Sequence, residues 1–354
     1  MKTIKKLATP LLTILLCLSS CTLDKEKLYQ RIPKVDAHVH LRTKDRAIMD
    51  FALSEGFQLV SINTRSYSQE YINEQKRFAR DMKDKYSEDL EWLATFSMEG
   101  FEEPGWAEKV VKKLQEDLED GAVGFKIWKD IGMTFRDSTG HYIFLDDPLF
   151  KPILEFMENS GRPVLTHIGE PRNCWLPIED MTVNGDKSYF SNNPQYHAYL
   201  NIHIPSHERL MESRDHVLAT YPNLRMVGAH LGSLEWDVDV LAERLDRYPN
   251  FAVDMAARVC HFQVQEWEKV RSFIIKYQDR LIYATDLGVS GDFDEEKRTW
   301  LENEWHSDWT YFATDQVLKS RNLDQAFMGL NLSPKVLRKI YYTNAMHWYP
   351  DAFN

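Results

Sequence analysis

Residues 34–41 read KVDAHVHL, and this stretch places two histidines two positions apart just after Asp36. In an extended strand, side chains at positions i and i+2 share a face and lie roughly 7 Å apart along the backbone. Two imidazoles at that spacing can converge on one metal ion, with bonds of about 2 Å to Zn²⁺. The alternative is a strand whose polar face carries His38 and His40 without any metal, so the decision depends on the rest of the chain.

Seven further apolar runs have the length and composition of strands, and helical patterns separate them. The runs are FQLVSINT (57–64), LEWLATFS (90–97), AVGFKIW (122–128), RPVLTHIG (162–169), LRMVGAHLG (224–232), FAVDMAAR (251–258) and RLIYATDLG (280–288). Between them, apolar residues recur at spacings of three and four, which is typical of amphipathic helices. One such stripe ends at Gly121, and the last helix is expected to begin at Ser333 and Pro334, a favourable N-cap and first helical residue.

Strands that alternate with helices predict parallel strands joined by crossover helices. Eight of them fit a single-domain, closed (β/α)8 TIM-like barrel over residues 34–354 better than an open sheet. Two long loops interrupt the pattern, residues 169–205 after the fifth strand and residues 288–332 after the eighth. Loops that follow strands lie on the catalytic face of such a barrel, so we expect both to cover a site.

The first residues are expected to be a targeting segment rather than part of the fold. Three lysines precede an apolar run at residues 11–18 that is too short to span a bilayer, and LSSC follows. This resembles a bacterial lipoprotein signal, which implies removal of residues 1–20, lipidation of Cys21 and a polar tether over residues 21–33. The alternatives are an ordinary cleaved signal and an uncleaved anchor. The expected location is the periplasm or the cell surface, with a lipid as the only membrane attachment.

Net charge and composition restrict the partners. A formal net charge of -11 and the lack of a basic stripe argue against nucleic acid, which leaves small molecules as the expected substrates. Cys174 and Cys260 are the only cysteines outside the targeting segment, and we interpret them as packing residues. The sequence leaves a homo-oligomer open.

Ionisable residues occur where the predicted strands end. Buried barrel strands should read as continuous Val, Ile and Leu. Five of these strands instead carry ionisable groups near their carboxyl ends, where a barrel places catalytic residues. They are His38 and His40, Lys126, His167, His230 and Asp286. A single buried histidine is more often a core residue than a ligand, but the repetition at matching positions predicts a metal site.

These residues resemble the amidohydrolase superfamily, specifically its amidohydrolase-related branch. The resemblance covers nearly all of residues 35–349, including ESRDHVLATYPNLRMVGAHLGS (212–233) and KIYYTNAMHW (339–348). That branch contains metal-dependent hydrolases and lactonases, and decarboxylases similar to aminocarboxymuconate semialdehyde decarboxylase. One departure is Leu287-Gly288, where many decarboxylases of the branch continue with an aromatic residue or histidine and then proline.

The resemblance implies that His38, His40, His167 and Asp286 hold one divalent ion. Three imidazoles and a carboxylate suit Zn²⁺ and would also accept Mn²⁺ or Fe²⁺. Asp286 would also accept and pass on a proton. His230 would polarise the scissile carbonyl or hold the nucleophile. Asp36 would either orient an imidazole or make a hydrogen bond to the barrel floor.

The role of Lys126 stays open at this point. It either stays cationic, binding a substrate carboxylate or a structural partner, or becomes carboxylated and bridges a second metal ion. Weaker candidates for substrate binding are Arg65, Trp128, His203 and Arg258, which follow strands or lie in the loops over the expected site. A guanidinium can grip a carboxylate and a tryptophan offers a flat apolar wall, although each residue also has an ordinary surface or packing role.

The expected function is a metal-dependent hydrolase that uses activated water on an ester, lactone or amide. The alternative is a metal-dependent, non-oxidative decarboxylase. A non-catalytic ligand-binding lipoprotein ranks below both, because loss of activity usually costs a ligand residue and all the expected ones are present.

Overall fold

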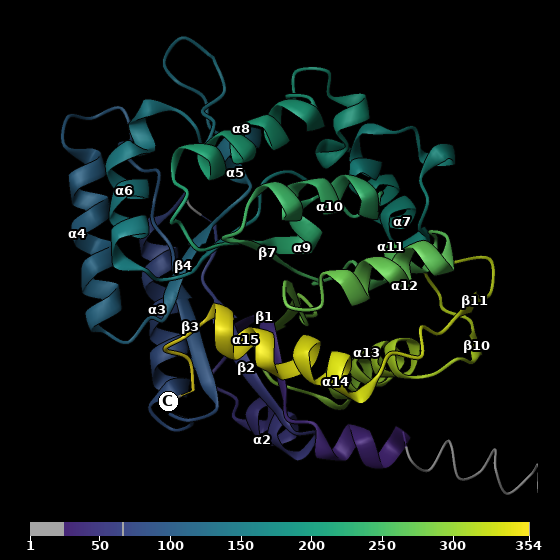
Figure 1. Cartoon of the computed structure of the whole chain (residues 1–354). Helices are drawn as coiled ribbons and strands as arrows, with labels where there is room; N and C mark the ends of the chain where they lie inside the picture. Colours follow the sequence, from purple (N-terminus) through teal and green to yellow (C-terminus); the bar gives the residue numbers. More distant parts are fainter. Residues whose placement is uncertain (1–24, 66, 354) are drawn as a thin grey trace, which may run out of the picture.

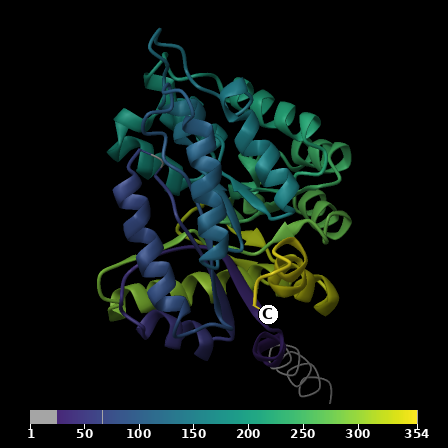
Figure 2. The same cartoon turned by 90° about the vertical axis from the view of Figure 1, so that its left-hand side faces the viewer.

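A parallel, curled sheet forms the centre of the computed structural model, which describes residues 25–65 and 67–353 (Figure 1). Its strands hydrogen-bond in the order β8-β7-β6-β5-β4-β3-β2-β1-β9. Their bounds are β1 Lys34–Arg42, β2 Phe57–Ile62, β3 Leu90–Ala94, β4 Gly124–Ile127, β5 Val164–Thr166, β6 Met226–Gly228, β7 Phe251–Asp254, β8 Leu281–Ile282 and β9 Leu287–Ser290. The sheet has the form of a half-barrel, and helices surround it on the outside (Figures 1 and 2).

The two edge strands, β8 and β9, belong to one chain segment. β8 pairs with β7, and β9 pairs with β1 in the register Val39 to Leu287. Between them, the amide of Ala37 donates to the carbonyl of Tyr283 at 3.2 Å, and the amide of Asp286 donates to that of His38 at 2.9 Å. Residues 281–290 therefore link both edges of the sheet, with Asp286 at the interruption between the two strands.

All eight predicted runs contain a strand of the sheet. Apart from β1, the strands are shorter than the runs, because the last residues of several runs leave the ladder and turn over the carboxyl edge. His167 follows the end of β5, and His230 lies in α9 directly after β6. His167, His230 and Asp286 thus lie just beyond strands, whereas His38 and His40 lie within β1 and Lys126 lies within β4.

The helices have the following bounds: α2 Ala47–Ser54, α3 Gln69–Lys83, α4 Trp106–Glu119, α5 Asp130–Met133, α6 Lys151–Ser160, α7 Asn184–Asn192, α8 His207–Thr220, α9 Ala229–Gly232, α10 Val238–Arg247, α11 Val259–Gln263, α12 Trp267–Lys276, α13 Glu295–Ala313, α14 Pro334–Arg338 and α15 Asn344–Trp348. The predicted caps are confirmed. The Ser333 hydroxyl accepts from the amide of Val336, and Gly121 follows α4 with a φ of 96°, a conformation that glycine adopts at little cost.

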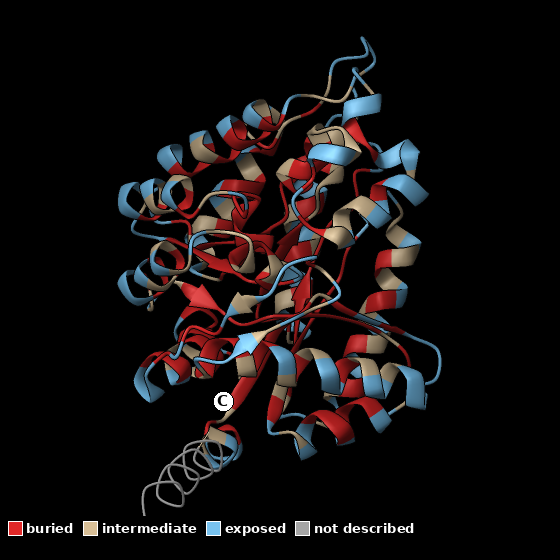
Figure 3. Cartoon of the chain, turned by 90° about the vertical axis from the view of Figure 1, so that its right-hand side faces the viewer, coloured by how far each residue is buried: buried red, intermediate tan, exposed pale blue. Residues whose placement is uncertain are grey.

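Two apolar layers hold the sheet in place. Side chains on its inner face, such as Val35, Val60 and Leu165, pack against Trp348 and Tyr349 of the C-terminal region. The outer face packs against the surrounding helices, where Trp305 of α13 stacks on Phe57 with ring centroids 4.0 Å apart. Figure 3 shows this arrangement as a buried sheet inside helices that are exposed only on their outer faces.

Both predicted loops contain secondary structure. Residues 169–205 include α7 and four short 3₁₀ turns, and they have a small apolar core of their own around Cys174 and Phe190. Residues 288–332 include β9, α13 and the antiparallel pair β10 Val317–Leu318 and β11 Phe327–Met328. Cys174 and Cys260 are both free thiols.

The region before β1 packs against the body from residue 25 onward. Residues 25–31 are helical, and the fully buried ring of Tyr29 contacts Trp309 of α13 with centroids 5.3 Å apart. Lys34 donates from Nζ to the carbonyl of Tyr29 at 2.8 Å. The second half of the predicted tether is therefore docked rather than free. The predicted signal and Cys21 lie outside the described residues. No helix among residues 25–65 and 67–353 has the length and apolar character needed to cross a membrane.

Candidate functional site

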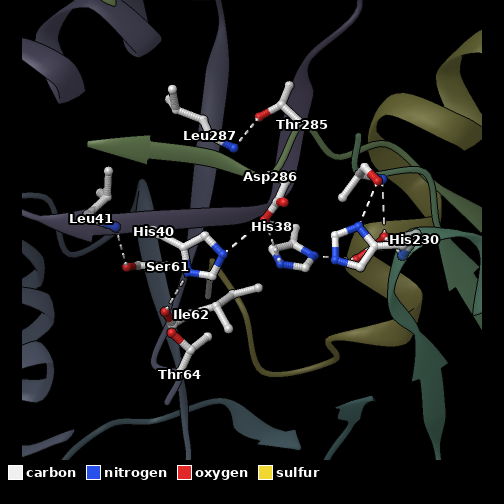
Figure 4. Close-up of polar contacts among 12 residues, drawn as sticks. His38, His40, Leu41, Ser61, Ile62, Thr64, His230, Thr285, Asp286 and Leu287 are labelled. Atoms are coloured by element: carbon white, nitrogen blue, oxygen red, sulfur yellow. Dashed lines mark hydrogen bonds and ion pairs between the residues drawn. The ribbon is translucent and has the colours of Figure 1, made fainter. Parts of the chain in front are cut away.

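Two histidines of β1 meet Asp286 at the carboxyl edge of the sheet (Figure 4). Oδ1 of Asp286 lies 2.9 Å from Nε2 of His40 and 3.3 Å from Nε2 of His38. The imidazole rings of His38 and His40 are 5.3 Å apart and nearly perpendicular. Both side chains thus lie on one face of β1, and both direct Nε2 toward Asp286.

The opposite nitrogen of each ring is hydrogen-bonded to an acceptor. Nδ1 of His38 lies 2.7 Å from Oδ2 of Asp254, and Nδ1 of His40 lies 3.2 Å from the carbonyl oxygen of Ile62. Nδ1 of His230 lies 2.8 Å from the carbonyl oxygen of Ala256. Since these partners only accept, Nδ1 carries the proton in each neutral ring, and Nε2 presents a lone pair. Burial lowers the pKa of His40 and lowers that of His230 to about 3, which favours neutral rings.

A cation is the partner that this arrangement lacks. The Nε2 lone pairs of His38 and His40 face a carboxylate oxygen of Asp286, so hydrogen-bond acceptors face one another with no proton between them. Nε2 of the buried His38 has no hydrogen-bond donor among the described residues. Burial opposes ionisation of Asp286, and neutral rings that present lone pairs offer it no compensating charge, so a cation at this position would keep the carboxyl ionised. Imidazole nitrogen together with carboxylate oxygen is a donor set that suits Zn²⁺, Mn²⁺ or Fe²⁺. The residues present therefore fit a divalent metal ion.

Two further histidines, His167 and His230, are candidates for the next coordination position. One ligating atom each from His38, His230 and Asp286 lies within 4.8 Å of the others. His167 packs edge-on against His230, with ring centroids 4.2 Å apart, and both of its nitrogens are buried without a partner among the described residues. His230 thus offers the ligating atom that lies closer to His38 and Asp286. His167, in contrast, has two buried nitrogens without a hydrogen-bond partner in the described chain, which an ion would satisfy. The predicted ligand set stays a prediction.

Lys126 projects from β4 into the same site. Its Nζ is fully buried and has no hydrogen-bond partner within the described chain. Burial lowers the pKa of Lys126 to about 8, although the charges of Asp254 and Asp286 oppose the shift. Nζ lies 5.8 Å from the centre of the Trp128 ring, and that ring also packs edge-on against His40 and His167. Trp128 is thus a wall of the site.

Asp254 is the functional residue that the sequence analysis missed. Its buried carboxylate holds Nδ1 of His38 with one oxygen, and with the other it accepts from the amides of His230 at 2.7 Å and Ala256 at 3.1 Å. His230 needs this support, because it and Leu231 both have a φ of 58°, a left-handed conformation that costs non-glycine residues about 1–3 kcal/mol each. The available signal was the carboxylate that ends the apolar run FAVD, the same pattern that identified Asp286.

The Asp36 side chain contacts no imidazole of the described residues and bonds instead to Thr285, after β8, and to Trp305 of α13. Its carboxylate accepts from the amide of Thr285 at 3.0 Å, from the hydroxyl of Thr285 at 2.6 Å and from Nε1 of Trp305 at 3.2 Å. These bonds tie β1 to the residue before Asp286, so Asp36 stabilises the sheet and orients no imidazole. Burial raises the pKa of Asp36 to about 6.

The weaker substrate-binding candidates lie at different depths. Arg258 is partly buried, and its Nε has no partner among the described residues, while Nη1 donates to the carbonyl of Ala257. Arg65 is exposed and donates to the hydroxyl of Tyr67, and His203 is exposed on the 169–205 segment. His207, outside the predicted site residues, is buried at the start of α8, with Nε2 2.8 Å from the carbonyl oxygen of Ser233.

A cavity of about 790 Å³ lies beside the strand ends. Ala284, Thr285 and Arg258 line it on the side of the sheet, and α13 and residues 318–327 line it on the outside. None of His38, His40, His167, His230, Asp286 or Lys126 lines this cavity, so it is separate from the histidine cluster.

Comparisons with known proteins agree with this geometry. The family model described as Amidohydrolase matches residues 35–350. No curated protein matches the chain at a significant level. Among solved structures, an uncharacterized TIM-barrel protein from Bordetella bronchiseptica has a TM-score of 0.51 at 15% identity, covering 91% of this chain and 99% of that one.

Two enzymes are similar in fold to the same degree. A probable 2-pyrone-4,6-dicarboxylic acid hydrolase from Acinetobacter baumannii, with citric acid bound, has a TM-score of 0.51 at 10% identity and covers 90% of this chain and 100% of its own. A 5-carboxyvanillate decarboxylase from Novosphingobium aromaticivorans, in complex with manganese and 4-hydroxy-3-methoxy-5-nitrobenzoic acid, has a TM-score of 0.51 at 13% identity, covering 91% and 97%. At these identities the likeness shows a shared fold.

Proposed function

This chain belongs to the amidohydrolase family, and on that basis we propose that it is a metal-dependent hydrolase that adds water to an ester, lactone or amide of a small organic substrate. The observation that carries the proposal is the convergence of the Nε2 atoms of His38 and His40 on the carboxylate of Asp286, with His167 and His230 beside them. We interpret the sheet as a (β/α)8 barrel over residues 34–354 in which β8 and β9 share the eighth position.

His38, His40, His167 and Asp286 are the proposed ligands of one divalent ion. The unpartnered nitrogens of His167 support its place in this set, because a buried imidazole without a partner is costly and an ion would satisfy it. The ion is Zn²⁺, Mn²⁺ or Fe²⁺, and manganese gains support from the fold neighbour that contains it. When bound, such an ion lowers the pKa of a coordinated water to about 7 and polarises a carbonyl.

The protein groups supply the proton transfers. Asp286, ionised beside such a cation, can accept the proton of the attacking water on its carboxylate and deliver it to the leaving oxygen or nitrogen. His230 has its proton on Nδ1, bound to Ala256, so Nε2 can accept a hydrogen bond from the nucleophile but cannot donate one to a carbonyl. Of the two roles predicted for His230, holding the nucleophile is therefore favoured.

The substrate is held by groups on two sides of this centre. Lys126 offers an ammonium group to a substrate oxygen or carboxylate, and the Trp128 ring offers a flat wall. Arg258, whose buried Nε has no partner among the described residues, is a further proposed contact for a substrate oxygen. Arg65 and His203 remain proposed contacts for the distal end of a substrate.

Decarboxylation on the same centre is the second candidate. It is favoured by Lys126, a buried ammonium group without a partner beside an aromatic wall, which suits an aromatic carboxylate, and by the decarboxylase among the fold neighbours. It predicts release of CO₂ without net addition of water. Carboxylation of Lys126 would instead create a bridge to a second ion and favour hydrolysis. A binding lipoprotein without activity ranks third.

The cellular setting is part of the proposal. Residues 1–20 are proposed to be removed and Cys21 lipidated, which would attach the chain to a membrane of the periplasm or cell surface through its lipid alone.

The test combines metal content with product analysis. Protein purified without chelators is analysed by elemental mass spectrometry, and small esters, lactones, amides and aromatic acids are then screened for water addition and for CO₂ release. We expect one ion per chain and hydrolysis that is lost in Asp286→Asn while the fold is kept. Metal with CO₂ release alone would select decarboxylation, and absence of metal after reconstitution would overturn both enzyme proposals.

A further inference from the structure

Residues 188–207 form a surface without a single Asp, Glu, Lys or Arg. At the chain's average of 27% charged residues, a segment of this length would carry about five. The segment reads SYFSNNPQYHAYLNIHIPSH, and we refer to it as the neutral platform. Its composition, rich in Tyr, Asn and Ser, is typical of surfaces that recognise other molecules.

Apolar exposure is concentrated on this platform. Eleven large apolar or aromatic side chains are exposed among the described residues, and five of them belong to it: Tyr189, Tyr196, Tyr199, Leu200 and Ile202. Ile202 is 85% exposed and Leu200 is 58% exposed. Single exposed apolar residues need no explanation, but a cluster without charges is typical of the core of a protein interface.

The platform is built on a firm base. Phe190 and Ala198 pack with Cys174 and Met181 in the separate apolar core of this segment. The buried ring of His197 lies with Nε2 2.8 Å from the carbonyl oxygen of Leu176.

Further contacts hold the outer part in shape. The Asn201 amide donates to the carbonyl of His197 at 2.7 Å. The rings of Tyr189 and Tyr196 are held parallel, 9° apart in angle and 6.4 Å between centroids. The surface is therefore pre-shaped, which reduces the entropy lost when a partner binds.

The platform lies on the same side of the sheet as the candidate site. It belongs to the segment that follows β5 and His167. Glu170, at the start of the same segment, forms an ion pair with Lys129, the chain neighbour of Trp128 in the wall of the site. A partner seated on the platform would therefore lie next to the mouth of the site.

We propose that the neutral platform is the contact face of a homodimer, in which the platforms of two copies pack on each other about a two-fold axis. A two-fold contact places the same patch on both sides, so any carboxylate within it would face its own copy. Each chain carries a net charge of -11, which makes like-charge repulsion the main obstacle to self-association. The neutral platform contains no charged residue, so two copies can pack through it without like-charge repulsion inside the contact. Its exposed apolar side chains supply the attraction.

The test is the oligomeric state of the purified chain, measured by sedimentation velocity from about 1 to 100 µM, the range in which a weak to moderate dimer dissociates. We expect a dimer for the natural sequence. Leu200→Glu and Ile202→Glu should each weaken dimerisation by about tenfold or more, because each places a carboxylate opposite its own copy. Both positions are exposed, so circular dichroism and melting temperature should stay unchanged.

Val317→Glu is the matched control, since Val317 is 70% exposed on β10 outside the platform and receives the same charge. It should dimerise like the natural sequence. A natural chain that stays monomeric over the whole range overturns the proposal and leaves the platform to a different protein or to a flat uncharged ligand. Equal weakening by the platform variants and by Val317→Glu also overturns it, because the effect would then be one of net charge.

Discussion

Asp254 accepts a hydrogen bond from Nδ1 of His38 at 2.7 Å, although the two residues are 216 positions apart. The same carboxylate receives the amide of His230. One buried acid on β7 thus selects the tautomer of an imidazole on β1 and supports the strained turn after β6. Positioning partners of this kind are as important to a metal centre as the ligands themselves.

Asp254→Asn should weaken metal binding by about 10- to 100-fold. The amide nitrogen of asparagine can occupy the position of the acceptor for Nδ1, and His38 would then place its proton on Nε2 and lose the lone pair that faces the site. Metal affinity is measured by competition with a chromophoric chelator. Asp308→Asn is the control, because Asp308 is a buried carboxyl whose contact is the hydroxyl of Tyr283 rather than an imidazole. Equal losses in both variants would contradict the role of Asp254.

The roles of His167 and His230 can be separated by their alanine variants. We expect His167→Ala to lose tightly bound metal. His230→Ala should keep the metal and lose about 10²- to 10⁴-fold in kcat, the usual loss for a group that handles the nucleophile's proton. Elemental analysis and steady-state kinetics on the same preparations provide the measurement. Loss of metal from His230→Ala alone would exchange the two roles, as the 4.8 Å grouping of His38, His230 and Asp286 would allow.

Lys126→Met tests whether the buried ammonium binds substrate or metal. If Lys126 is cationic, the variant should still hold one ion per chain, while KM for a substrate that carries a carboxylate rises by about tenfold or more. KM for a neutral ester of similar size should change little. A fall from two ions to one in the variant would instead identify Lys126 as a carboxylated bridge.

Asp308→Asn should also change the dependence of stability on pH. Burial, followed by the charge of Glu304, raises the pKa of Asp308 well above its usual range. A carboxyl with a raised folded-state pKa favours folding at low pH, and this contribution is lost as the pH rises through that pKa. The natural chain should therefore lose unfolding free energy between about pH 4, the ordinary pKa of an aspartate, and pH 8, and the asparagine variant should lose less. Urea denaturation at both pH values measures the difference, and parallel curves would contradict the prediction.

The strands and the ring of ionisable residues were accessible from sequence because both are local patterns. The eight apolar runs mark the strands, and the ionisable residues near the ends of five of these runs mark the edge where the strands meet. Asp286 and His40 could thus be assigned to one centre before any contact between them was known. Gly121 and Ser333 identified helix ends for the same reason, since their conformational preferences depend on the adjacent residues.

The features that could not be predicted from the sequence depend on contacts between distant parts of the chain. His38 bonds to Asp254, and Asp36 bonds to Thr285, across more than 200 positions of the chain. Such pairings produce no periodic pattern in the sequence from which they could be predicted. The docking of Tyr29 against α13 is equally long-range, so the segment before β1 looked like a polar tether.

The split eighth strand has a consequence for how the protein matures. Asp286 and His40 are 246 residues apart, and they meet only when residues 281–290 bridge the two edges of the sheet. Contacts between such remote segments form slowly, because a large loop must close before they give any stabilisation. A chain still emerging from the ribosome has no complete centre until nearly all of it has been synthesised. Metal capture should therefore coincide with the slowest refolding phase, and the chain should not sequester ions while it is still partly unfolded.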